Sequence, residues 1–559
     1  MFPTEMPVIN FSFGDLKSLM GKEIDFETLV DRLPMMGADV HTAEKDNDEL
    51  AFEFFPDRPD LYSVEGIARA FSAFLGMNPG LRRYEVSESD VVLNVDPSVE
   101  QVRPFIWSAL VTDVEMNDFL IRSVMDIQEK LHLTVGRNRK KVAIGIHDFD
   151  TVNSPFLYTT SAPDEMSFFP LQGTREMTLR EILEVHDKGR AYAFVLEGKE
   201  RYPIILDRDQ NVLSFPPIIN GIVTTVTEET KNILVDCTGT DLSALKVTVN
   251  ILVTALAERG AKIHSVKIVR GSEGAAAPDL EPWKISVPLD MVEELTGIRE
   301  PPEKLIELLA RMGYSAAMDG SSLSVDVPAY RYDILHPADI IEDIAKAYGY
   351  ERFGSKLPKY STLGASDIEF DFWEVLRNAM IGLGYLEVST LTLTGREDQY
   401  GRTRRPEPEQ IVEVMNPRSN DHSILRTSLL PELMAILRKN KHRDLPQRIF
   451  EVGEVVEELR NSGRLAGASI HAKASFTEMK SFVEGLLRSV GIRLKIAPAE
   501  DPSFIKGRCA NVLIDGEVSG LFGEVHPEVI SSFELGYPIA AFELRVSPVM
   551  KGTNDSWSR

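Results

Sequence analysis

Four carboxylates stand close together in the stretch from Asp333 to Asp343. Successive residues of an α-helix turn by about 100°, so Asp339, Glu342 and Asp343 share one helix face at positions i, i+3 and i+4. Asp333 lies in the preceding loop, from which it can fold back over that face. Carboxylates without Cys or His partners are typical of sites for hard cations that prefer oxygen. The stretch predicts a site for Mg²⁺ or Ca²⁺, and the spacing does not choose between the two.

The same carboxylates also have a purely structural interpretation. Acidic residues in a first helical turn interact favourably with the helix dipole, and Asp is a good N-cap. Lys346 follows Glu342 by four residues and Asp343 by three, so it can neutralise both. Spacing alone leaves both interpretations open.

A second group of small polar residues lies between Ser214 and Asp241. Asn220, Asp236 and Thr238 flank two apolar runs that favour strands, an arrangement that suits a pocket for a small polar ligand. The alternative is a pair of turns in which Asp241 caps the following helix.

Composition excludes several classes of protein. The chain has 61 Lys and Arg against 86 Asp and Glu, a net charge of −25, so contact with nucleic acid requires local basic patches or a more basic partner. Cys237 and Cys509 are the only cysteines, which rules out a disulfide framework and fits a reducing cytoplasm. No apolar run approaches the roughly 20 residues of a membrane span. The sequence has no Gly-x-x-x-x-Gly-Lys loop, no Gly-x-Gly-x-x-Gly motif and no Gly-x-Ser-x-Gly elbow.

An internal repeat suggests two related small modules. The segment 29–37 resembles 305–313, and 64–69 resembles 341–346. Between these segments, Arg58-Pro-Asp60 in the first copy matches Arg331-Tyr-Asp333 in the second.

The elements that must position these residues form an α+β, multidomain chain. Between the two modules, strand patterns dominate and two helices interrupt them. A Gly/Ala/Pro stretch then predicts a linker, and the last segment predicts an antiparallel sheet that carries helices. The principal expected elements are strands at 105–111, 142–146, 191–196, 204–206 and 233–235, helices at 118–131 and 242–258, the linker at 271–278 and a closing strand at 539–546.

Taken together, the motifs resemble those of one family, the β subunit of phenylalanine–tRNA ligase of the archaeal and eukaryotic type. The resemblance covers nearly the whole chain in the right order. It rests on the segments Phe55–Arg69, Ser214–Asp241, Val327–Asp343, Asn416–Pro431 and Arg448–Gly453.

The resemblance implies a division into an N-terminal module (1–76), an editing domain (77–270), a B5-like metal-binding module (271–352) and a catalytically inactive class II synthetase-like domain (353–559). It also implies an α2β2 assembly with an α subunit, which joins phenylalanine to tRNA(Phe) with ATP through an aminoacyl-adenylate and edits Tyr-tRNA(Phe). By the same resemblance, Mg²⁺ is bound by Asp333, Asp339, Glu342 and Asp343. The editing pocket is formed with help from Asn220, Asp236 and Thr238.

One departure from an active class II enzyme stands out. The closing strand lacks the glycines of the ATP-binding turn, and only a tail is expected after it. The adenylation site is therefore expected on the α subunit. Two other hypotheses are a non-enzymatic scaffold subunit and a free-standing metal-dependent hydrolase. The hydrolase is disfavoured because no His base accompanies the carboxylates.

Overall fold

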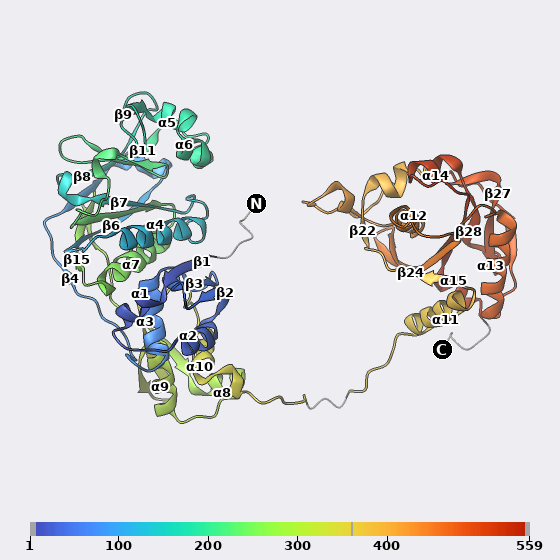
Figure 1. Ribbon diagram of the computed structural model, residues 1–559, viewed down its shortest axis with the longest axis horizontal. Coiled ribbons are helices and arrows are strands. Elements are labelled where there is room, and N and C mark those ends of the chain that lie inside the picture. Colours follow the sequence, from blue (N-terminus) through green and yellow to red (C-terminus); the bar gives the residue numbers. More distant parts are fainter. Residues whose placement is uncertain (1–6, 359–361, 554–559) are drawn as a thin grey trace. The chain divides into compact units, whose positions relative to one another are not determined.

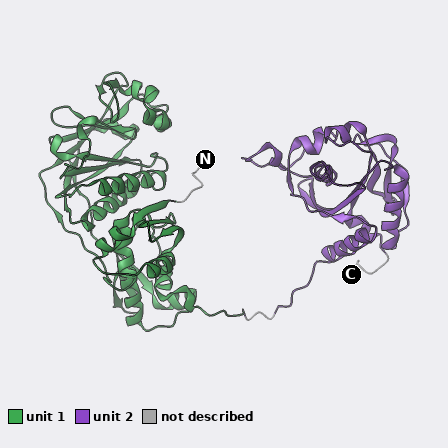
Figure 2. Ribbon diagram, in the orientation of Figure 1, with its two compact units in different colours: residues 1–357 green, residues 358–559 purple. Residues whose placement is uncertain are grey.

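The computed structural model describes residues 7–358 and 362–553, and the end of the expected tail lies outside these ranges. The chain divides into two compact units, Met1–Leu357 and Pro358–Arg559 (Figure 2). No described helix is both long and apolar enough to cross a lipid bilayer.

The first unit begins and ends with a small module, and the two modules have the same order of elements (Figure 1). The strands of each module form an antiparallel sheet in which the third strand lies in the middle, with orders β1-β3-β2 and β18-β20-β19. This match confirms the internal repeat. The first module contains β1 (Val8–Ser12), α1 (Phe13–Met20), α2 (Phe26–Arg32), β2 (Ala38–Glu44), β3 (Glu49–Phe54) and α3 (Val64–Phe74), and the second contains β18 (Trp283–Pro288), α8 (Leu289–Thr296), α9 (Pro302–Arg311), β19 (Ser315–Asp319), β20 (Ser322–Val327) and α10 (Pro337–Tyr348).

Local chemistry explains where the last helix of each module begins. The Ser63 hydroxyl accepts a hydrogen bond from the Gly66 amide and caps α3. A side chain at Gly66 is impossible, because a Cβ there would lie 1.9 Å from the Asp60 carbonyl oxygen. In the second module, Asp343 occupies the position equivalent to Gly66. The two modules therefore differ at the point where the preceding turn contacts the helix.

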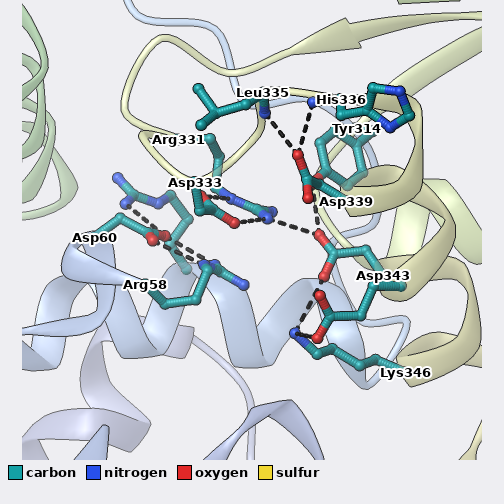
Figure 3. A network of polar contacts seen from close by, with 12 residues as sticks. Arg58, Asp60, Tyr314, Arg331, Asp333, Leu335, His336, Asp339, Asp343 and Lys346 are labelled. Carbon is teal, nitrogen blue, oxygen red and sulfur yellow. Dashed lines mark hydrogen bonds and ion pairs between the residues drawn. The ribbon is translucent and has the colours of Figure 1, made fainter. Parts of the chain in front are cut away.

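A buried charge network lies where the two modules meet (Figure 3). Arg58 donates from Nε and Nη2 to the carboxylate of Asp60, at 2.8 and 2.9 Å. Arg331 donates to Asp333 with the same two nitrogens, at 2.8 and 2.5 Å, and its Nη2 also reaches Asp343 Oδ2 at 2.7 Å. Pairing and hydrogen bonding offset the cost of burying these charges.

Asp343 shows the strength of this pairing. Its side chain is about 1% exposed, and Tyr314 donates to the same oxygen that Arg331 contacts. Burial opposes ionisation of the carboxyl, but the positive charges of Arg331 and Lys346 outweigh it and lower the pKa of Asp343 to about 2.

The middle domain of the first unit is built on two sheets. The five-stranded sheet has the order β4-β15-β6-β14-β7 and the seven-stranded sheet has the order β13-β12-β11-β8-β5-β16-β17. The strands of the first are β4 (Val86–Ser87), β15 (Lys262–His264), β6 (Phe105–Thr112), β14 (Ile233–Gly239) and β7 (Val142–Asp148). Those of the second are β13 (Ile219–Asn220), β12 (Val212–Phe215), β11 (Tyr202–Leu206), β8 (Phe156–Ser161), β5 (Val92–Val95), β16 (Val266–Arg270) and β17 (Glu273–Ala277).

Helix α7 (Leu242–Glu258) packs on β6 and β14 and joins the middle domain to both modules. Arg259, which follows it, donates to Asp15 at 2.8 Å and to Glu65 at 2.6 Å in the first module. The Asn250 amide donates to the carbonyl oxygens of Asp279 and Ala329 beside the second module. A single hydrophobic core runs through these three parts.

Two sequence predictions in this domain are wrong. The expected strand at 191–196 is the end of helix α6 (Asp187–Tyr192) followed by a 3₁₀ turn, where Arg139 stacks on the Tyr192 ring at 4.0 Å. The expected linker at 271–278 is instead mostly strand β17, which pairs antiparallel with β16. A tight turn joins the two strands, and Gly271 has the positive φ of 59° that such turns require.

The second unit is an antiparallel sheet with helices on both faces, and only its short first strand pairs in parallel. One hydrophobic cluster includes residues of α11, α13 and α15, and another includes residues of α12 and α14. In sheet order the strands are β21 (Leu386–Glu387), β24 (Gln447–Glu457), β25 (Arg460–Ile470), β29 (Ile539–Arg545), β28 (Glu517–Val525), β27 (Phe504–Ile514) and β26 (Lys495–Pro498), and the helices are α11 (Ile368–Gly382), α12 (Leu430–Lys439), α13 (Phe476–Ser489), α14 (Pro527–Ser532) and α15 (Val546–Lys551).

Helix α15 corrects the expectation that only a tail follows the closing strand β29. Val546 and Val549 are buried in the core, and their spacing of three residues places both on one helix face. The helix is short and includes Pro548, so its sequence does not show the repeated apolar spacing by which longer helices are predicted. No glycine occurs in β29 or α15.

Replacing Arg331 with Leu should destabilise the first unit strongly. The substitution removes the cation between Asp333 and Asp343 and leaves Asp343 buried, so we expect the free energy of unfolding to fall by about 3–5 kcal/mol. Denaturant unfolding of the chain measures this. Arg299→Leu is the matched control, because Arg299 is 81% exposed and pairs with Glu293 at the surface, where about 1 kcal/mol or less is expected. Equal effects of both substitutions would contradict the account.

The contribution of Asp343 should also depend on pH. Its pKa is about 2 in the folded chain and roughly 4 in an unfolded chain. Its stabilising effect is therefore complete above about pH 4 and is lost as the pH falls towards 2. The stability difference between the wild type and Asp343→Asn should shrink over that interval in chemical denaturation. A difference that is independent of pH would contradict the pairing.

Candidate functional site

A cavity of about 490 Å³ lies between the two sheets of the middle domain. Strands β7 and β14 and helix α4 (Asp118–Leu133) contribute to its lining on one side, and β12, β13 and the segment 216–218 contribute on the other. Asn220, Asp236 and Thr238 all line it. The fold therefore brings the three polar residues selected from the sequence into one pocket.

Asp236 supplies a buried carboxylate to this cavity. Its side chain is about 2% exposed, and Oδ2 lies 2.7 Å from Nε2 of His147. In the sheet register Asp236 stands opposite Gly145 of β7, and a Cβ at Gly145 would lie 2.0 Å from that oxygen. Only glycine leaves room for the carboxylate at this point of the sheet.

Thr238 is held by a buried arginine. Arg103 donates from Nε to the Thr238 hydroxyl oxygen at 2.9 Å and from Nη2 to the Thr238 carbonyl oxygen at 2.6 Å. Burial lowers the pKa of Arg103 to about 10, which still leaves it protonated near neutral pH. Because the Thr238 hydroxyl accepts from Arg103, its own hydrogen is available to a ligand.

Asn220 ties the two sheets together at the cavity. Its amide oxygen accepts from the Ser214 hydroxyl at 3.0 Å, and its amide nitrogen donates to the Ile146 carbonyl oxygen at 3.3 Å. Ser214 and Asn220 are paired in β12 and β13, whereas Ile146 belongs to β7. The side chain thus fixes the width of the pocket.

Sequence reasoning missed two residues of this site, Arg103 and His147. His147 and Gly145 are two residues apart in β7, so they face the same side of the sheet. This alternation along the strand is the sequence feature from which the position of His147 beside the cavity could have been predicted. Arg103 carries no such signal, because it lies in a loop distant from β14 in the sequence.

Positively and negatively charged side chains also line the cavity. Arg139 and Lys188 contact Glu129 of α4, at 2.9 and 3.3 Å. Arg139 also donates to the carbonyl oxygens of Pro217 and Ile218, so it braces the cavity wall. Its neighbour Lys140 is exposed.

The four carboxylates selected as metal ligands do not gather at one point. Asp333 and Asp343 are held by Arg331, as described above. Asp339 accepts from the backbone amides of Leu335 and His336, both at 2.7 Å, within the cap of α10. Glu342 pairs with Lys346 at 2.9 Å and is largely exposed.

These contacts match the structural interpretation of the acidic helix. In the described part of the chain, no three acidic, His or Cys side chains converge in a way that could hold a metal ion. As placed, the four carboxylates do not fit a single ion, since a guanidinium already lies between two of them. Magnesium at Asp333, Asp339, Glu342 and Asp343 stays a prediction from the sequence.

Metal removal tests that prediction. An ion bound only by the folded chain raises its melting temperature by mass action. From the contacts of these carboxylates we expect the isolated chain to melt at the same temperature, within about 1 °C, in millimolar Mg²⁺ and in chelator. If Mg²⁺ raised the melting temperature and Asp339→Ala abolished that increase, the carboxylates would instead rearrange around an ion.

Three family models match the chain. The B3/4 domain matches residues 108–269, and the tRNA synthetase B5 domain matches residues 285–350. The phenylalanyl tRNA synthetase beta chain CLM domain matches residues 354–546. The first of these matches contains Asn220, Asp236 and Thr238.

Curated relatives match over nearly the full chain. The phenylalanine–tRNA ligase beta subunit of Methanothrix thermoacetophila is 45% identical over 97% of this chain and 100% of the relative. That of Methanococcoides burtonii is 44% identical over 96% of this chain and 99% of the relative. An N-terminal fragment of the phenylalanyl-tRNA synthetase beta subunit from Pyrococcus horikoshii is structurally similar, with 38% identity and a TM-score of 0.59 over 62% of this chain and all of the fragment. The resemblance seen in the sequence is thereby confirmed: the chain belongs to the phenylalanine–tRNA ligase beta subunit family and is a subunit of an aminoacyl-tRNA ligase.

Proposed function

We propose that this chain acts with an α subunit to attach phenylalanine to tRNA(Phe), using ATP and a phenylalanyl-adenylate, and that its middle domain hydrolyses Tyr-tRNA(Phe). Family membership supports the charging role. The observation that carries the editing role is the cavity between the two sheets, which combines apolar walls with one buried carboxylate.

The cavity has the size and chemistry for a tyrosyl group. Its volume of about 490 Å³ lies within the usual range for small-ligand sites. Apolar side chains such as Val124, Ile144 and Ile146 line it and suit an aromatic ring. Asp236 Oδ1 accepts no hydrogen bond from the described residues, so a phenolic hydroxyl would supply its missing donor.

Such a pocket would select tyrosine over phenylalanine. An aminoacylation site shaped for an apolar ring discriminates by only about 100-fold against a substrate that carries one extra hydroxyl. A site built to hydrogen-bond that hydroxyl rejects the analogue that lacks it by roughly 10⁴–10⁵, because its buried polar group is left unpaired. Asp236 would give the editing pocket this second kind of discrimination.

Hydrolysis in the cavity would rely on a positioned water and on substrate groups. The side chain of Cys237 points to the opposite face of β14 from that of Asp236, and burial raises the pKa of its thiol well above the ordinary value. The Ser214 hydroxyl is already bound to Asn220. Neither side chain is placed as a nucleophile, and Asn220 and Thr238 would orient the aminoacyl ester.

The adenylation site would lie on the α subunit, within an α2β2 assembly. In the second unit, Glu543 of the closing strand accepts hydrogen bonds from the Ser428 hydroxyl and from the amides of Leu429 and Leu430. This carboxylate therefore holds the start of α12 rather than facing a free substrate site. We infer that the assembly works in the cytoplasm; Mg²⁺ at Asp333, Asp339, Glu342 and Asp343 stays a prediction from the sequence.

Truncation of the cavity carboxylate tests the editing role. In the assembled enzyme, Asp236→Ala should leave phenylalanine charging within about twofold and slow deacylation of preformed Tyr-tRNA(Phe) by at least about 10-fold. Accumulation of Tyr-tRNA(Phe) during charging should rise accordingly. Asp209→Ala, which removes an exposed carboxylate of the same domain, is the control. Unchanged deacylation in the Asp236 variant would leave a non-enzymatic scaffold as the better description of the middle domain.

Pyrophosphate exchange tests the placement of the adenylation site. The purified chain alone should not catalyse phenylalanine-dependent ATP–pyrophosphate exchange, and addition of the α subunit should restore it. Exchange by this chain alone would refute the assignment of adenylate formation to the partner.

A further inference from the structure

His147 is fully buried and makes a polar contact with each of its ring nitrogens. Nε2 lies 2.7 Å from Asp236 Oδ2, and Nδ1 lies 2.8 Å from the Thr224 hydroxyl oxygen. The three side chains come from β7, β14 and the turn after β13. They form a continuous chain of contacts that ends at the cavity.

The chemistry of the carboxylate sets the direction of the contact between His147 and Asp236. An ionised carboxylate can only accept, so His147 donates its Nε2 hydrogen to Asp236. The Thr224 hydroxyl lies 2.8 Å from Nδ1 and 3.3 Å from the Gly221 carbonyl oxygen, so it contacts both the ring and the backbone of its own turn. Thr224 therefore orients His147, and His147 orients Asp236.

This arrangement treats the two oxygens of Asp236 differently. Oδ2 is occupied by His147 and lies over Gly145, where no side chain competes for the space. Oδ1 has no hydrogen-bond partner among the described residues and belongs to a side chain that lines the cavity. One oxygen is thus anchored so that the other is presented to a ligand.

We propose that His147 is the positioning residue that sets the specificity of the editing pocket, because it holds Asp236 with one carboxylate oxygen directed at the phenolic hydroxyl of a tyrosyl group. The inference rests on the proposed editing function and adds a determinant to it. His147 itself does not touch the substrate. Its effect passes through Asp236 and disappears when that carboxylate is absent.

A second buried histidine of the same domain serves as a matched control. His132 is about 1% exposed, and its Nε2 accepts a hydrogen bond from the Ile144 amide of β7. It does not line the cavity and does not contact Asp236. His132 therefore reports what the loss of a buried imidazole beside β7 does to the domain while Asp236 keeps its own contacts.

The experiment uses the assembled enzyme with preformed Tyr-tRNA(Phe) and Phe-tRNA(Phe). The variants are His147→Leu, His147→Gln, Asp236→Asn, the double variant His147→Leu with Asp236→Asn, and His132→Leu. His147→Leu should lower the ratio of Tyr to Phe deacylation, measured as kcat/KM, by at least about 10-fold and leave phenylalanine charging unchanged. His147→Gln keeps an N–H donor near the carboxylate and should recover the ratio to within about threefold of the wild type.

The double variant separates positioning from stability. If His147 acts through Asp236, the double variant should edit no more slowly than Asp236→Asn alone. The inference would be overturned if the effects of the two single substitutions multiplied in the double variant. It would also be overturned if His147→Leu lowered the Tyr-tRNA(Phe) and Phe-tRNA(Phe) deacylation rates only as much as His132→Leu does. If Asp236→Asn itself leaves editing unchanged, the proposed function fails. If Asp236→Asn abolishes editing but His147→Leu keeps the Tyr-to-Phe ratio, only the role of His147 fails.

Discussion

The guanidinium of Arg331, held between Asp333 and Asp343, is the interaction on which the first unit depends. It lies where the two repeated modules meet, beside the equivalent Arg58–Asp60 pair of the other copy (Figure 3). The joined modules both contact α7, and α7 packs against the strand that carries Asp236 and Thr238. Packing contacts therefore link the module interface to the domain that contains the cavity.

Buried carboxylates in this chain have two different environments. In the module interface each carboxylate is matched by arginine, which makes the contact stable but leaves no oxygen for a ligand. In the cavity, the His147 ring contacts Oδ2 of Asp236, and no described residue donates a hydrogen bond to Oδ1. A hydroxyl-bearing ligand in the cavity would give Oδ1 a hydrogen-bond donor. This difference separates a structural carboxylate from one suited to recognition.

Local patterns predicted much of this architecture, and long-range contacts supplied what they missed. Periodicity and capping predict α7 at Leu242–Glu258, and the Arg-x-Asp pairs indicate the repeated modules in the sequence itself. The convergence of Asn220, Asp236 and Thr238 was predictable because they flank apolar strands. The bridge made by Arg331, however, depends on how the modules meet, and strand β17 depends on pairing with β16. Neither the anchoring of the Asp236 carboxylate nor that of the Thr238 hydroxyl follows from residue spacing.

In the proposed editing function, the cavity recognises a tyrosyl group through Asp236. A crystal structure of the assembled enzyme with a non-hydrolysable tyrosyl-adenosine analogue tests it directly. We predict that the phenolic oxygen lies within about 3.2 Å of Asp236 Oδ1 while Oδ2 keeps its contact with His147. An analogue bound outside the cavity, or bound inside it with the phenol turned away from Asp236, would contradict the account.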